Sequence, residues 1–296
     1  MKKILLIGKT GQVGWELERA LTAVGEVVAL DSSQLNLTDT QQLRTTLRVI
    51  APDVIVNAAA YTAVDQAEAE SDLAMAVNGI APGVMAEEAK RLNALLIHYS
   101  TDYVFDGSKT GAYTEQDMPN PLSVYGKTKL HGEQAIQATA CRHLIFRTSW
   151  VYGNRGKNFM LTMLRLARQG VQLKVVNDQI GAPTPSRMIA QATAEVLQCA
   201  ATQRSEFEKI NGLYHLTAAG QTSWFGFALA IFEQAVRAGR LAMQPAVVAV
   251  SAGEYVTAAR RPSNSVLSNE KFSQVFGFTL PNWETALALI LAEQAP

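Results

Sequence analysis

The most constraining feature of the sequence is a glycine-rich turn that directly follows a short apolar segment near the N-terminus. Residues 3–7 have the composition of a buried strand, and Gly8, Gly11 and Gly14 follow at intervals of three residues. In such a turn the first glycine permits a tight bend, the second lets the backbone approach a pyrophosphate, and the third allows the next helix to pack closely. The pattern predicts a dinucleotide-binding turn, and the alternative is an ordinary strand-to-helix connection.

The first half of the chain alternates short β-branched apolar segments with longer segments of helical period. This alternation is typical of an α/β protein with a Rossmann-type, doubly wound parallel sheet covered by helices. Pro82 is expected to kink or break the third helix. The expected strands are residues 3–7, 27–30, 54–56, 94–100 and 143–147, and the expected helices are residues 15–24, 40–50, 68–92 and 124–138.

After about residue 150 this regular alternation gives way to loops, helices and isolated strands. Helices are expected at residues 159–169, 186–199, 224–237 and 283–293, and strands at residues 173–176, 213–217 and 247–250. We expect a dinucleotide-binding domain at residues 1–150 and a smaller, less regular α/β lobe at residues 151–296 that mainly binds substrate. A strand of the second half could return to the first sheet.

Composition and charge limit the classes of binding partner and the cellular compartments that we expect for this protein. The 296 residues include 26 Lys and Arg and 26 Asp and Glu, so the formal net charge is zero and provides no field that gathers nucleic acid or anionic lipid. Cys141 and Cys199 provide neither a disulfide framework nor a metal-ligand spacing. No apolar run approaches the roughly 18 residues that span a bilayer. We therefore expect a cytoplasmic protein that binds neither nucleic acid nor a membrane.

The strongest catalytic signal is the pair Tyr125 and Lys129. Residues four apart share one face of a helix, and an adjacent ammonium is expected to lower the pKa of a phenol toward the neutral range. Such a spacing is common by chance, so its context decides. Thr101 ends the fourth expected strand, at the sheet edge where ligands bind, and its hydroxyl can hydrogen-bond a substrate carbonyl. Together the three residues predict an acid–base site.

Several further residues have a functional and a structural interpretation. Asp31 ends the second expected strand and can accept hydrogen bonds from an adenosine ribose, which favours NADH, whereas Lys9 could attract the extra phosphate of NADPH; the choice stays open. Trp150 can present an aromatic wall to a sugar or a base, or pack in the core. Asp102 can bind sugar hydroxyls or cap its loop. Arg260 or Arg261 can meet a diphosphate or be a solvated surface residue.

The sequence resembles the extended short-chain dehydrogenase/reductase superfamily in its sugar-nucleotide form, and within it the dTDP-4-dehydrorhamnose reductases. The resemblance implies that Thr101, Tyr125 and Lys129 are catalytic and that Asp102 and Trp150 bind the sugar. It also implies that the dinucleotide is bound by Gly8, Gly11, Gln12, Val13, Gly14, Asp31, Ala60, Tyr61, Thr62, Tyr99, Tyr125 and Lys129, with Asn36 and Leu37 near the adenine. The segments that carry it are residues 8–14, 57–65, 100–107, 125–129, 147–153, 178–184 and 261–265.

The same resemblance implies reduction by NADPH or NADH of the C4 keto group of dTDP-4-dehydro-L-rhamnose, a homodimer, and a product used in cell-surface polysaccharide. Magnesium is often associated with the family, but no cluster in the sequence identifies a site, and Glu16 and Glu293 are only candidates. The four histidines, His98, His131, His143 and His215, are scattered and receive no function.

Three other interpretations remain. An epimerase or dehydratase of the same fold would retain NAD through its cycle. A non-catalytic regulatory subunit would keep the dinucleotide fold and bind a partner enzyme. A reductase of another nucleotide-linked deoxysugar would use the same residues, because fold and chemistry alone do not fix the substrate.

Overall fold

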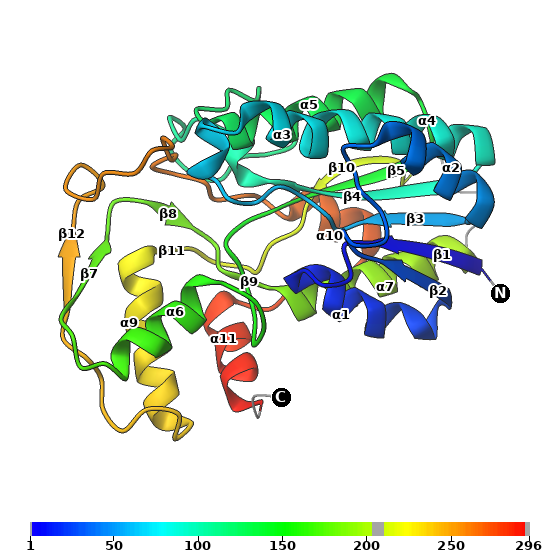
Figure 1. The fold of residues 1–296 in the computed structure, drawn as a ribbon. Coiled ribbons are helices and arrows are strands. Elements are labelled where there is room, and N and C mark those ends of the chain that lie inside the picture. Colours follow the sequence, from blue (N-terminus) through cyan, green and yellow to red (C-terminus); the bar gives the residue numbers. More distant parts are fainter. Residues whose placement is uncertain (1, 203–209, 294–296) are drawn as a thin grey trace.

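A computed structural model describes residues 2–202 and 210–293 (Figure 1). Its centre is a six-stranded sheet in the order β10-β5-β4-β3-β1-β2, in which every neighbouring pair is parallel. The fold class is therefore the α/β class predicted from the alternating pattern. The strands of this sheet are β1 (Lys2–Ile7), β2 (Gly25–Leu30), β3 (Val54–Asn57), β4 (Leu95–Thr101), β5 (His143–Thr148) and β10 (Gly212–His215).

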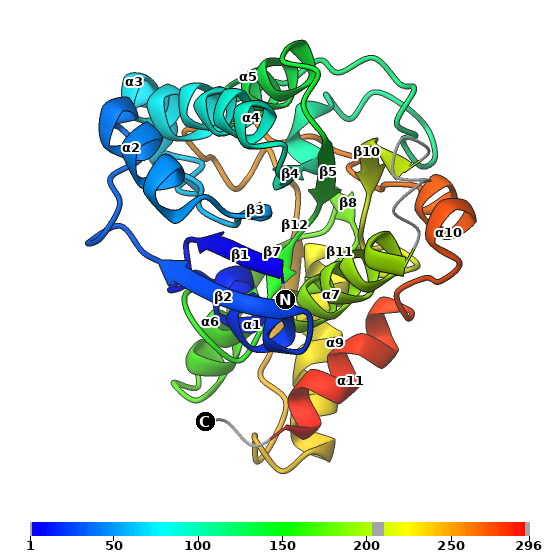
Figure 2. The same cartoon turned by 90° about the vertical axis from the view of Figure 1, so that its right-hand side faces the viewer.

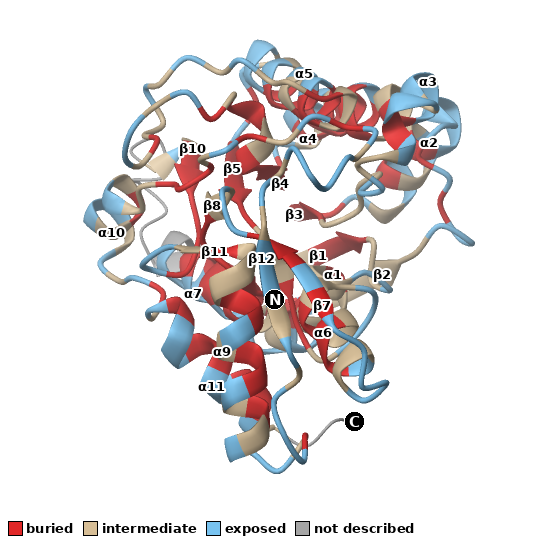
Figure 3. Ribbon diagram, turned by 90° about the vertical axis from the view of Figure 1, so that its left-hand side faces the viewer, coloured by how far each residue is buried: buried red, intermediate tan, exposed pale blue. Residues whose placement is uncertain are grey.

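Helices cover both faces of this sheet because its strands are apolar on both faces. In β1, Ile4 and Leu6 belong to the core cluster beneath α1 (Gln12–Ala20) and α7 (Ser186–Thr202), whereas Leu5 and Ile7 belong to the cluster beneath α2 (Thr40–Ile50) and α4 (Ala81–Leu92). Figure 2 shows α2, α4 and α5 (Val124–Ala138) on one side of the sheet and α1 and α7 on the other. The buried residues are concentrated in the central strands (Figure 3).

Two elements of the second half belong to this layered arrangement. Strand β10 pairs with β5, from Gly212 opposite Leu144 to His215 opposite Arg147, and it forms the edge of the sheet. Helix α7 packs against α1. A short helix, α10 (Glu270–Phe276), has no counterpart among the expected elements, and Phe272 of this helix joins the core cluster around Phe146.

The remaining elements form a second lobe with its own apolar core (Figure 1). Its helices are α6 (Phe159–Ala167), α9 (Trp224–Arg237) and α11 (Trp283–Ala292), and its outer strands β7 (Leu173–Val176) and β12 (Val247–Val250) pair in parallel. Outside this lobe, three-residue 3₁₀ turns lie at Leu21–Ala23, after α1, and at Asp102–Val104, after β4. Four two-residue strands complete the lobe as the pairs β6 (Val151–Tyr152) with β9 (Thr184–Pro185) and β8 (Ile180–Gly181) with β11 (Thr222–Ser223).

The third expected helix is present and is irregular before Pro82, where a kink or break was expected. Residues 68–92 form the end of a 3₁₀ turn (Gln66–Glu68), α3 (Ser71–Met75), a π-helical turn (Ala76–Ile80) and then α4. The helical backbone runs without a break from Ser71 to Leu92, so Pro82 lies inside it, and the π-helical turn directly before Pro82 is the irregularity that accommodates its missing N–H. The π-helical turn satisfies its own backbone and presents Asn78 to the loop after β3.

Within the described ranges, none of the helices is both long enough and apolar enough to cross a membrane.

Candidate active site

The β1–α1 turn is as tight as its glycines suggest. Gly8 has φ +93°, in the left-handed region that favours glycine. A Cβ placed on Gly14 would lie only 1.9 Å from the carbonyl oxygen of Gly8, so no other residue allows α1 to begin this close to β1. The turn therefore exposes backbone N–H groups at the carboxyl end of the sheet, as a pyrophosphate requires.

A cavity of about 500 Å³ opens at this edge of the sheet. It is lined both by the glycine turn and by the Tyr125–Lys129 pair. Nine of the residues predicted to bind cofactor line it, namely Gly8, Gly11, Gln12, Val13, Ala60, Thr62, Tyr99, Tyr125 and Lys129. The other lining residues are Thr10, Ser32, Ala58, Ala59, Ser100, Thr148, Val151, Gly156 and Lys157.

The other predicted cofactor residues lie outside that lining. Gly14 packs beneath the turn, and the Tyr61 hydroxyl donates to Glu70 Oε2 at 2.8 Å. Leu37 is buried in the core beside α2, and the side-chain oxygen of Asn36 accepts from the N–H and the hydroxyl of Thr38. The placement of Asn36 and Leu37 near the adenine thus stays a prediction.

Asp31 lies beside the cavity and is already engaged. Its carboxylate accepts from the N–H and hydroxyl of Ser33 at 3.0 and 2.6 Å, and these hydrogen bonds lower its pKa. Lys9 Nζ lies 3.7 Å from Asp31 Oδ2 and donates to the Gln34 side chain. One carboxylate and one ammonium therefore meet where an adenosine ribose or its phosphate is expected to bind.

Tyr125 and Thr101 are brought together by a close approach between helix and loop. Ser123 caps α5, and a Cβ on Gly126 would lie 2.2 Å from the carbonyl oxygen of Tyr103, so this glycine lets α5 touch the turn after β4. Burial raises the pKa of Tyr125 to about 12, and a hydrogen bond with Thr101 acts in the opposite direction. The expected lowering of this pKa by Lys129 is not seen: Lys129 is not among the causes of the shift, and desolvation leaves the pKa raised.

Lys129 is fully enclosed, with 1% of its surface exposed. Its Nζ donates to the carbonyl oxygen of Tyr99 at 2.6 Å and lies 3.2 Å from Nε2 of His98. Burial lowers the pKa of Lys129 to about 8. A lysine with this pKa can change its protonation state within the pH range of an enzyme assay.

Asp102 and Trp150, the expected sugar-binding residues, do not line this cavity, and their role stays a prediction. The Thr101 hydroxyl donates to Asp102 Oδ1 at 3.0 Å, and burial raises the pKa of Asp102 to about 6. Trp150 has φ +45°, an uncommon value for a bulky residue, and stacks on Trp224 with 3.5 Å between ring centroids. A Cβ on Gly181 would lie 2.5 Å from the indole of Trp150, so the ring is held on two sides.

The two arginines considered for a diphosphate differ in their surroundings. Arg261 pairs with Asp65 at 2.8 Å, which joins residues 257–261 to the loop after β3. Arg260 is exposed.

The residues considered for magnesium do not fit that ion. The Arg187 guanidinium of α7 bonds to Glu16 of α1 at 3.4 Å and to Glu293 after α11, so the two candidate carboxylates already share a cation. Among residues 2–202 and 210–293, no group of three or more His, Cys, Asp or Glu is placed to hold a metal.

Sequence reasoning missed several residues of the site. Thr10, Ser32, Ser100, Thr148, Val151, Gly156 and Lys157 line the cavity without having been assigned to it. Asn78 was also missed: its side chain accepts from the N–H of Tyr61 at 2.9 Å and donates to Tyr61 O and to Thr128. It thus ties the loop after β3 to α5. Only its position before Pro82, where a helix is disturbed, could have drawn attention to it.

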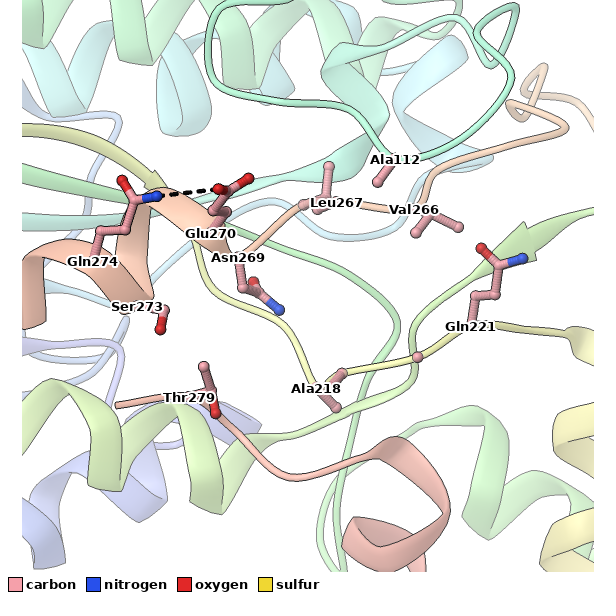
Figure 4. Close-up of a pocket in the computed structure, with 12 residues that line it drawn as sticks. Ala112, Ala218, Gln221, Val266, Leu267, Asn269, Glu270, Ser273, Gln274 and Thr279 are labelled. Atoms are coloured by element: carbon pink, nitrogen blue, oxygen red, sulfur yellow. Dashed lines mark hydrogen bonds between the residues drawn. The ribbon is translucent and has the colours of Figure 1, made fainter. Parts of the chain in front are cut away.

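A second cavity, of about 630 Å³, lies between α10 and the segment after β10 (Figure 4). Asn269, Glu270, Ser273 and Gln274 line it from the α10 side, and Gln221 lies on the opposite side. None of the predicted cofactor, substrate or catalytic residues lines this cavity, so we place the chemistry in the first.

Comparison with known proteins finds relatives that match nearly the whole chain. A dTDP-4-dehydrorhamnose reductase of Shigella flexneri is 47% identical over 294 residues, which are 98% of this chain and 97% of that protein. One from Burkholderia thailandensis is 47% identical over 293 residues, with 98% of each chain covered. The crystal structure of a dTDP-4-dehydrorhamnose reductase from Bacillus anthracis in complex with NADP superposes with a TM-score of 0.90 at 34% identity, covering 99% of both chains.

The fold defines an α/β protein of the Rossmann type. The family described as RmlD substrate binding domain matches residues 1–295, and the chain belongs to this family.

Proposed function

We propose that the protein reduces the C4 keto group of dTDP-4-dehydro-L-rhamnose to give dTDP-L-rhamnose, the last step in the synthesis of that sugar nucleotide, with NADPH or NADH as reductant. One observation carries the proposal: a single cavity joins the glycine turn to Tyr125 and Lys129, with Thr101 adjacent. Relatives support the proposal as well: proteins that are 47% identical over nearly the whole chain are named dTDP-4-dehydrorhamnose reductase.

Each side chain of the site has a separate role in the proposed reaction. A bound nicotinamide cofactor supplies the hydride that reduces C4. In our proposal the Thr101 hydroxyl donates to the substrate carbonyl oxygen, and Tyr125, which carries its proton at neutral pH because its pKa is about 12, transfers that proton to the forming alkoxide. Lys129 supplies positive charge that stabilises the resulting phenolate. Asp102 and Trp150 orient the sugar.

The choice of cofactor belongs to the proposal as well. The Asp31 carboxylate suits the ribose hydroxyls of NADH, whereas Lys9 can approach the additional phosphate of NADPH. The Bacillus anthracis protein is in complex with NADP, which supports binding of a nicotinamide dinucleotide. We further propose a homodimer located in the cytoplasm, on the family resemblance, and light scattering of the purified protein tests the first of these.

The decisive experiment follows NADPH or NADH absorbance when the purified protein meets dTDP-4-dehydro-L-rhamnose generated by upstream enzymes. We expect oxidation that depends on the substrate, with product identified as dTDP-L-rhamnose, and the two cofactors are ranked by kcat/KM. Folded protein that binds dinucleotide and oxidises neither cofactor would contradict the proposal. Tightly retained stoichiometric NAD would instead favour an epimerase or dehydratase.

A further inference from the structure

His98 is a buried histidine for which the proposed reaction has no use. It lies in β4, one residue before Tyr99, with 1% of its surface exposed. Its ring spans the space between two polar side chains: Nδ1 lies 3.0 Å from Asn57 Nδ2 at the end of β3, and Nε2 lies 3.2 Å from Lys129 Nζ. The three side chains therefore form a continuous buried chain that ends at the catalytic lysine.

The orientation of Asn57 fixes the first link of this chain. The side-chain oxygen of Asn57 accepts from the N–H of Ala59 at 3.2 Å. Rotating the amide would bring its NH₂ group against that N–H, with two donors facing each other, so the NH₂ group must face His98. An amide nitrogen can only donate, and His98 Nδ1 must therefore be an acceptor without a proton.

The second link follows from the first. A neutral imidazole carries one proton, so a His98 ring with a bare Nδ1 carries its proton on Nε2, where it points toward Lys129. An ammonium group has three donors and no lone pair, whereas a neutral amine can accept one hydrogen bond. The contact at 3.2 Å is satisfied only when the Lys129 amine is neutral, with another of its hydrogens donated to Tyr99 O.

We infer that Asn57 and His98 are positioning residues that hold Lys129 as a neutral amine in this arrangement and so set the pH range in which it gains its proton. The role given to Lys129 rests on the proposed function. Within that function, Lys129 is a group that titrates rather than a permanent cation, and it stabilises a Tyr125 phenolate only in the protonated state.

The surrounding charges agree with this inference. Burial lowers the pKa of Lys129 to about 8, and the carboxylate of Glu133, one turn further along α5, acts in the opposite direction. Glu133 is itself engaged by the Arg147 guanidinium of β5 at 2.6 and 2.9 Å. Burial holds the pKa of His98 well below its usual range, which keeps the ring neutral.

The first test compares the pH profiles of kcat/KM for the wild type, His98→Gln and His143→Gln. In His98→Gln, the new side-chain oxygen can turn toward Lys129 Nζ and accept a hydrogen bond from its ammonium form. Lys129 should therefore keep its proton to higher pH. We expect the alkaline limb of the profile to move upward by about one pH unit. His143 is a matched control, because it is a buried histidine of the neighbouring strand β5 that bonds to Cys141 O, outside the site. Its replacement should leave the limb in place.

An unmoved or lowered limb in a folded, active His98→Gln enzyme would overturn the inference, as would an equal shift in both variants. A wild type without substrate-dependent oxidation would instead defeat the proposed function, and the inference would then be decided by the second test.

The second test needs no variant. In wild-type protein with ¹⁵N-labelled imidazoles, the buried His143 and His215 should carry their protons on Nδ1, since that atom faces a carbonyl oxygen in each. His98 should give the single histidine signal that does not titrate near neutral pH and is protonated on Nε2. Absence of such a signal would contradict the arrangement.

Discussion

At the scale of single residues, the proposed proton donor Tyr125 allows the most direct test of the mechanism. Replacing Tyr125 by Phe removes the hydroxyl that gives its proton to the forming alkoxide and keeps the ring that packs edge-on against Tyr103. We expect kcat to fall by roughly 10²–10⁴, the usual contribution of a positioned general acid. Steady-state oxidation of NADPH at saturating substrate measures it.

Tyr214→Phe is the control for that measurement. Tyr214 is also a buried phenol, but its hydroxyl donates to Ile210 O, and it does not line the cavity. Its loss should cost stability and leave kcat close to that of the wild type. Undiminished turnover in Tyr125→Phe would remove Tyr125 from the mechanism.

Trp224 is a residue whose effect should appear in substrate affinity. It stacks on Trp150 with an interplanar angle of 6°, and Trp150 needs such support because its left-handed backbone costs of the order of 1–3 kcal/mol. Trp224→Leu should free the Trp150 ring and raise KM for the sugar nucleotide by about tenfold, with a smaller change in kcat. Kinetics at varied substrate separate the two constants.

Trp283→Leu provides the comparison, since Trp283 is buried in the same lobe and packs on Phe227, which in turn packs on Trp224. If both tryptophan variants raise KM equally, the effect is one of lobe stability and Trp224 does not position Trp150.

At the scale of elements, the approach of α5 to the turn after β4 places Tyr125 beside Thr101. A methyl group at Gly126 would press against the backbone carbonyl of Tyr103, which cannot rotate away. Gly126→Ala should therefore push the first turn of α5 outward, lower the free energy of unfolding by about 1–3 kcal/mol, and lower kcat by at least about tenfold. Denaturant unfolding and steady-state kinetics measure the two effects.

Gly253→Ala adds the same methyl group where the nearest atom is a side-chain oxygen at 3.8 Å, so neither quantity should change much. A Gly126→Ala enzyme as active as this control would show that α5 can reach Thr101 without the close approach.

The elements that sequence reasoning predicted well are those defined by local pattern. The five expected strands of the first half are present because each is an apolar run bounded by turn residues, and the glycine turn follows from its own spacing. The π-helical turn at Asn78 and the Trp150–Trp224 stack could not be predicted. Both depend on residues distant in the sequence, Tyr61 for the first and Trp224 for the second. The tautomer of His98 likewise depends on a distant residue, because the side-chain NH₂ group of Asn57, at the end of β3, faces its Nδ1 atom.

At the scale of the whole molecule, the chain crosses repeatedly between the central sheet and the second lobe. Helix α7 of the second half packs on α1 of the first, and α11 ends beside both, at Glu293. Arg187 joins these three elements through Glu16 and Glu293, and Asn154 also donates to Glu293. The Arg187 guanidinium therefore helps to hold the two lobes together.

This arrangement predicts a protein that does not depend on a divalent cation. Because the Arg187 guanidinium already neutralises Glu16 and Glu293, EDTA or added Mg²⁺ should leave both the melting temperature and kcat unchanged.

Arg187→Ala should lower the free energy of unfolding by only about 0.5–1 kcal/mol, since the side chain is 38% exposed and solvent screens its pairs. Arg237→Ala is the matched control, because its Glu233 partner lies on the same helix and joins no two elements. A loss of stability or activity in EDTA would show that a metal site exists, and equal stability of the two arginine variants would show that Arg187 does not hold the lobes together.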